Sequence, residues 1–112
     1  MIKKTDKESY LYIIEHNQNL YDCLIKFEEN NAHTLLVKNN NKIIGTVTDG
    51  DIRKALIRYR TLQTKVNLVM NMSFVFATSD NQCEELFDNN KHVVLIPVLN
   101  QQRELISIFL RY

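Results

Sequence analysis

The stretch that decides the fold covers residues 42–56 and reads KIIGTVTDGDIRKAL. Residues 43–48 are a short apolar run with β-branched side chains, which predicts a strand. The next three residues, Asp49, Gly50 and Asp51, break this strand. Apolar residues then recur at helical spacing, with acidic residues at the positive end of the helix dipole. The stretch therefore predicts a strand that leads directly into a helix.

Thr48 and Asp51 lie on either side of this strand-to-helix junction, so their side chains can converge on one ligand. A carboxylate suits the two hydroxyls of a ribose. A threonine hydroxyl beside free helix N–H groups suits a phosphate. Gly45 would let another backbone or a flat base come close. The same residues also fit a simpler role as a turn and helix cap, and both interpretations stay open.

The neighbouring segments predict a repeated pattern of elements. Helical spacing predicts a helix over residues 20–29, and an Asn-rich turn joins a strand at 33–37 to the strand at 43–48. A similar order follows, with a helix after Ser79-Asp80, an apolar run at 93–99 and a strand at 105–110. An offset of about 62 residues aligns the halves through the pairs Gly45 and Ser107, Val37 and Leu99, and Leu24 and Leu86.

Five residues of the junction carry a family resemblance: Gly45, Thr46, Val47, Thr48 and Asp51. They resemble the motif that ends a CBS domain, the module named after cystathionine β-synthase: Gly, two mostly apolar residues, Ser or Thr, two variable residues, then Asp. The resemblance implies an α/β (α+β) fold in which tandem β-α-β-β-α half-repeats form one compact module. The first repeat would be residues 1–65, and the second residues 66–112, truncated at its closing helix.

The resemblance also implies a regulatory ligand in a cleft between the repeats: AMP, ADP, ATP or S-adenosylmethionine. Thr48 would contact phosphate or ribose, Asp51 would hold the ribose hydroxyls, Gly45 would belong to the same site, and Arg53 would reach further phosphates. In the second repeat, Leu110 stands where the motif has Ser or Thr, and the chain stops before the Asp position. At most one well-formed nucleotide site is therefore expected.

The variant TDGDIRKAL at residues 48–56 resembles CBS pairs fused to sugar-phosphate isomerases and pairs at the N-terminus of sugar-phosphate nucleotidyltransferases. Residues 96–110 are more similar to the second group. We therefore expect the N-terminal regulatory part of such a transferase, a homodimer with an attached or associated catalytic domain. The rival hypothesis is a ligand-free module for dimerisation or interaction.

Composition excludes several other functions. The chain has 112 residues, enough for one domain, and its net charge of +1 offers no general attraction to nucleic acid or acidic membranes. Its two glycines cannot build a phosphate-binding loop such as G-x-G-x-x-G. The two cysteines lack partners at zinc-ligand spacing, which predicts free thiols and no metal site. The apolar stretch at residues 10–14 is too short for a signal-peptide core, and no apolar run is long enough to span a bilayer, which predicts a cytoplasmic protein.

The three histidines, His16, His33 and His92, are scattered along the chain. They share no metal-ligand spacing, and no partner close in sequence makes one of them a general base. Without an arrangement of nucleophile and base, the sequence predicts a protein that is not itself an enzyme.

Overall fold

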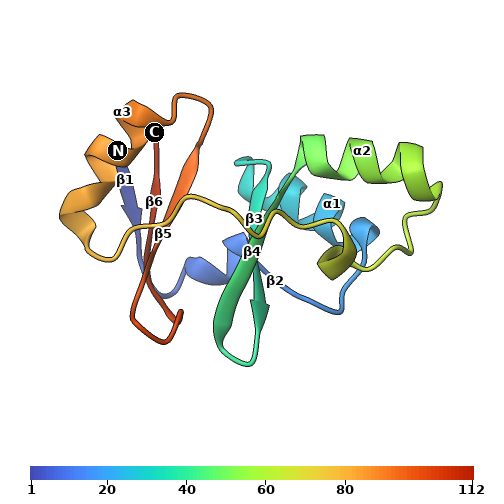
Figure 1. The fold of residues 1–112 in the computed structure, drawn as a ribbon, viewed down its shortest axis with the longest axis horizontal. Coiled ribbons are helices and arrows are strands. Elements are labelled where there is room, and N and C mark those ends of the chain that lie inside the picture. The colour runs from blue at the N-terminus through green and yellow to red at the C-terminus, as the bar shows by residue number, and fades with distance from the viewer.

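The computed structural model describes all residues, 1–112, as two small α/β units that lie side by side (Figure 1). Each unit contains one three-stranded sheet. The first sheet has the order β2-β3-β4, with bounds Ile13–Glu15, Thr34–Asn39 and Lys42–Thr48. The second has the order β1-β6-β5, with bounds Ile2–Lys4, Leu105–Leu110 and Leu95–Leu99.

Three α-helices accompany the sheets: α1 (Leu20–Asn30), α2 (Asp49–Tyr59) and α3 (Cys83–Asn89). Single 3-10 turns cover Ser9–Tyr12, Val66–Leu68 and Asp80–Gln82. The helices and hairpins predicted from the sequence are all present, so the α+β fold class is confirmed. No helix has the length and apolar character needed to cross a membrane.

The core has three parts. Helices α1 and α2 bury Cys23, Phe27, Ile52 and Ala55 against the first sheet. Helix α3 and the second sheet form a smaller cluster around Phe87. Between the units, both sheets contribute apolar residues to one further cluster: Tyr12, Leu36, Ile43, Phe74, Leu95, Leu99, Ile108 and Leu110. Burial of this shared surface holds the units together as one module.

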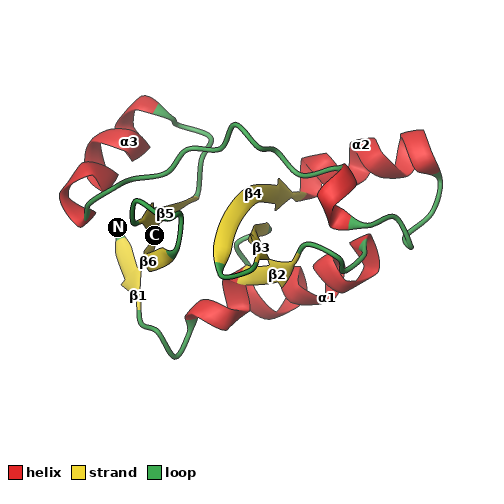
Figure 2. Ribbon diagram, turned by 60° about the horizontal axis from the view of Figure 1, so that its bottom comes forward, coloured by secondary structure: helices red, strands yellow, loops and turns green.

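Strand β1 belongs to the sheet of the second unit, although it is the first strand of the chain (Figure 2). It runs antiparallel to β6, with Ile2 opposite Leu110 and Lys4 opposite Ile108. The linker between the units makes a similar pairing with β4, where Asn71 bridges Thr46. A division of the chain between residues 65 and 66 stays a prediction.

The offset of 62 holds for only part of the repeat. Val37 lies opposite Gly45, and Val98 lies opposite Ser107, each beside a β-bulge. Val37 therefore corresponds to Val98, and the predicted match to Leu99 is wrong by one residue. In the helices, the buried pair Cys23 and Phe27 corresponds to Cys83 and Phe87, so the match of Leu24 to Leu86 is also wrong. The reason is loop length, because two loops of the second unit are each one residue longer.

Candidate ligand site

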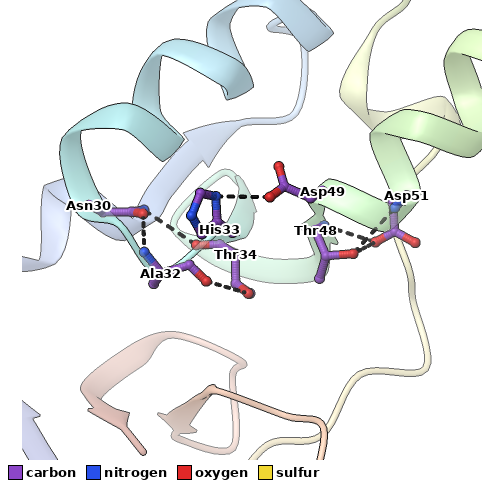
Figure 3. A network of polar contacts seen from close by, with 7 residues as sticks. All are labelled: Asn30, Ala32, His33, Thr34, Thr48, Asp49 and Asp51. Carbon is purple, nitrogen blue, oxygen red and sulfur yellow. Dashed lines mark hydrogen bonds and ion pairs between the residues drawn. The ribbon is translucent and has the colours of Figure 1, made fainter. Parts of the chain in front are cut away.

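Thr48 and Asp51 form a reciprocal cap at the start of α2 (Figure 3). The backbone N–H of Thr48 donates to Asp51 Oδ2 at 2.9 Å, and the Thr48 hydroxyl donates to the same oxygen at 3.1 Å. In return, the backbone N–H of Asp51 donates to Thr48 Oγ1 at 3.3 Å. The other carboxylate oxygen, Oδ1, accepts no hydrogen bond within the chain. The simpler role as a helix cap is therefore present, and one oxygen remains free for a ligand.

Helix α1 begins with the same device, built from Asn19 and Asp22. The backbone N–H of Asn19 donates to Asp22 Oδ2 at 3.2 Å, and that of Asp22 donates to Asn19 Oδ1 at 3.0 Å. A capping box satisfies free N–H groups at any helix start. The box at Thr48 is therefore not in itself evidence of binding, and the case for a site depends on its surroundings.

Gly45 admits the linker between the units. A Cβ atom built on Gly45 would lie 2.8 Å from Met70 Sδ and 3.1 Å from the Asn71 carbonyl oxygen. Asn71 is held there by two backbone hydrogen bonds to Thr46, of 2.8 and 3.0 Å. Of the two close approaches predicted for Gly45, the one by another backbone is confirmed. Met70 and Asn71 cover the face of Gly45 on which the alternative prediction placed a flat base.

A cleft of about 320 Å³ opens between the units at the end of β4. The first unit contributes Thr34, Thr46 and Thr48, and the linker contributes Asn71 and Ser73. The second unit supplies the far wall with residues 90 and 92–95, from the loop after α3 and the start of β5. The lining is thus polar on the side of the first unit and includes apolar side chains such as Phe74 and Val93.

Asp51 and Arg53 do not line this cleft. Asp51 faces a second hollow of about 200 Å³ between α2 and the linker, together with Lys54 and Arg58. Arg53 is exposed, and its guanidinium nitrogen Nη2 lies 3.8 Å from the Cβ position of Gly50, at the start of the helix. The structure therefore brings Thr48 and Asp51 into contact but directs them to different hollows. Ligand roles for Gly45, Thr48, Asp51 and Arg53 stay predictions.

His33 meets Asp49 beside this cap, an ion pair that the sequence does not indicate (Figure 3). Its Nδ1 lies 2.8 Å from Asp49 Oδ2, and both side chains are about half exposed. Asp49 is 16 residues from His33, so a search for partners close in sequence does not find it. Two carboxylates, of Asp49 and Asp51, occupy the first turn of α2, where free N–H groups were expected to favour a phosphate.

The two cysteines are free and buried, in the cores of separate units. Burial raises the pKa of the Cys23 thiol to about 12, and burial also raises the pKa of Cys83. No group of three or more His, Cys, Asp or Glu side chains is arranged to hold a metal ion.

Comparison with known proteins finds a likeness between the first unit and one protein family. A family model described as the CBS domain matches residues 9–58, which include α1, the whole first sheet and all but the last residue of α2. An uncharacterised protein of Helicobacter pylori (strain J99) is 30% identical over 66 residues, which cover 58% of this chain and 20% of that protein. The chain therefore matches about a fifth of the length of this curated relative.

Solved structures extend the likeness of fold to both units. The CBS domains of a transcriptional regulator from Streptococcus pneumoniae match with a TM-score of 0.76 at 18% identity, over 92% of this chain and 86% of theirs. GMP reductase from Trypanosoma brucei, in complex with guanosine 5'-triphosphate, matches with a TM-score of 0.64 at 18% identity, over 88% of this chain and 25% of the enzyme. Residues 9–58 are therefore similar to a CBS domain, and the chain as a whole has the fold of solved CBS-domain structures.

Proposed function

We propose that the chain is a regulatory module that binds an adenine nucleotide or S-adenosylmethionine in the cleft between its units. The observation that carries the proposal is the cleft itself, because its volume of about 320 Å³ lies within the range of small-molecule sites. Its lining combines apolar side chains, which suit a flat base, with hydroxyls, which suit a sugar.

Thr48 connects the cleft with Asp51, because it lines the cleft and is hydrogen-bonded to the Asp51 carboxylate. The Thr48 hydroxyl donates to Asp51 Oδ2 at 3.1 Å. A ribose hydroxyl that binds Thr48 from the cleft would lie next to the carboxylate, whose Oδ1 is free. A side-chain rotation of Asp51 would then place a charged acceptor on the ribose, and hydrogen bonds to charged groups are the stronger ones.

Regulation would follow from the position of the cleft. Its walls come from both units, so a bound ligand contacts both and favours the arrangement it fits best. A ligand shifts such an equilibrium only by its differential affinity for the two arrangements. An attached or associated enzyme would respond to that shift. A sugar-phosphate nucleotidyltransferase is our candidate for this enzyme, and it is suggested by the sequence of residues 96–110 alone.

The second candidate function is a ligand-free module for dimerisation. The observation in its favour is a set of large apolar side chains on α2 and the linker: Ile57, Leu68 and Met72 are 76, 65 and 73% exposed. Contacts between copies of the chain would remove these side chains from water. Light scattering over a range of concentrations measures this association directly.

Calorimetry with AMP, ADP, ATP and S-adenosylmethionine tests the proposed ligand site. Asp51→Ala should weaken binding by about tenfold to a hundredfold, since a hydrogen bond to a charged group contributes about 1.5–3 kcal/mol. Asp22→Ala is the matched control, because it removes the equivalent capping carboxylate from α1, outside the cleft. Equal affinity of the two variants would refute the role of Asp51, and no binding by the wild type to any of the four compounds would favour the ligand-free module.

A further inference from the structure

The cleft between the units is almost without charge. Its polar lining consists of hydroxyls and amides, contributed by Thr34, Thr46, Thr48, Asn71, Ser73 and Asn90. No Lys, Arg, Asp or Glu side chain lines it, and His92 is the one side chain there that can become positively charged. A multiply charged ligand group would therefore lose its hydration in this cleft without gaining an opposite charge, which is unfavourable.

The surroundings of Thr48 also oppose a chain of phosphates. Asp49 and Asp51 lie in the first turn of α2, directly after Thr48. Their negative charges offset the positive end of the helix dipole, which would otherwise attract an anion. A phosphate placed near Thr48 would meet two carboxylates, so the ligand should place its neutral sugar near Thr48 and any charged group away from it.

The second unit's wall of the cleft includes the loop that carries His92, and Arg111 fixes this loop. Arg111 Nη2 donates to the carbonyl oxygen of Asn90 at 2.7 Å and to that of Val93 at 2.6 Å, on either side of His92. Arg111 Nε also donates to the Val93 carbonyl, at 2.9 Å. The backbone at His92 is therefore held in place, while its exposed imidazole can turn toward a ligand.

From this distribution of charge we infer that the cleft selects adenosyl compounds with one phosphate or none, and that His92 binds the single phosphate. The inference rests on the proposed function and names the ligand class and a specificity-determining residue for the same site. AMP is then preferred to ADP and ATP, because each added phosphate brings negative charge that no side chain of the cleft can offset.

Titration calorimetry of the full chain with adenosine, AMP, ADP and ATP tests the inference. The wild type should bind AMP more tightly than ADP or ATP. His92→Gln should weaken the affinity for AMP about tenfold, because one hydrogen bond to a charged group is lost, and should change the affinity for adenosine by less than about twofold. Lys91→Gln is the matched control: it removes a full charge from the neighbouring, exposed residue, which does not line the cleft, and should leave both affinities within about twofold.

The possible failures can be told apart. ATP binding about tenfold more tightly than AMP, or an equal loss of adenosine and AMP affinity in His92→Gln, would overturn the inference and leave the proposed function intact. No binding by adenosine, by the three nucleotides or by S-adenosylmethionine would overturn both. If His92→Gln does not fold, the order of affinities of the wild type still decides whether the cleft rejects added phosphates.

Discussion

Alanine at the two glycines should have opposite effects on stability. At Gly45, the new Cβ would meet Met70 Sδ at 2.8 Å, Met70 Cγ at 3.0 Å and the Asn71 carbonyl oxygen at 3.1 Å. The methionine can move, but the carbonyl accepts a 3.0 Å hydrogen bond from Thr46 and belongs to the backbone. Overpacking of this kind costs about 1–3 kcal/mol. At Gly50, the nearest atoms are 3.7 and 3.8 Å away, which is ordinary contact.

The sizes of these effects follow from chain length. An unfolding entropy of about 2.1 cal/mol/K per residue means that 1 kcal/mol shifts the Tm of a chain of 112 residues by about 4 °C. Gly45→Ala should therefore lower the Tm by about 4–12 °C. Gly50 lies in α2 without a positive φ, so Gly50→Ala should leave the Tm unchanged or raise it by up to about 4 °C.

Scanning calorimetry of the wild type and both variants measures the difference. Adding Met70→Ala to Gly45→Ala should recover part of the lost stability, since it removes two of the three close contacts and leaves the carbonyl. Our explanation of Gly45 is wrong if Gly45→Ala is as stable as the wild type. Our explanation is also wrong if Gly50→Ala loses as much stability as Gly45→Ala, because replacing either glycine would then destabilise the protein regardless of the contacts at Gly45.

Three further predictions concern other parts of the molecule. With the pKa of Cys23 raised to about 12, only about one Cys23 thiol in ten thousand is ionised at pH 8. A disulfide-exchange reagent should therefore modify Cys23 no faster than the protein unfolds, and a rapid reaction of the native protein would contradict this. Hydrogen bonds from Lys3 and Ser107 lower the pKa of Asp80, so the contribution of these hydrogen bonds to stability should be complete above pH ~4 and decline below it. Asp80→Asn should reduce this acid sensitivity in urea titrations, and a pH profile identical to that of the wild type would contradict the prediction. Arg111→Met should accelerate amide exchange across residues 90–94 in mass spectrometry, and unchanged protection would show that other contacts hold the loop.

The sequence predicts the local elements well because their signals lie within one helix or one hairpin. The junction at residues 48–51 is an example: the residues that end the strand are those that cap the helix, so prediction and structure agree. The spacing of Leu20, Cys23 and Phe27 similarly identifies the buried face of α1. The fold class follows from such patterns together with the resemblance to a CBS domain.

The candidate site is predicted less completely because it depends on distant contacts. His33 has a left-handed backbone, with φ of 53°, and reaches Asp49 across the ends of two strands. The linker occupies the face of Gly45, and no pattern around either segment indicates this. His92 lines the cleft only because its loop closes over from the second unit. The repeat gives only an approximate signal, because the position equivalent to His33 is Val94, two residues after His92.

The place of β1 has a consequence for synthesis on the ribosome. Ile2–Lys4 is made first, but its only strand partner is β6, at residues 105–110. The first sheet, by contrast, is complete once residue 48 has been translated. A nascent chain can therefore assemble the first unit early, while its leading segment waits unpaired until residues 105–110 have been translated.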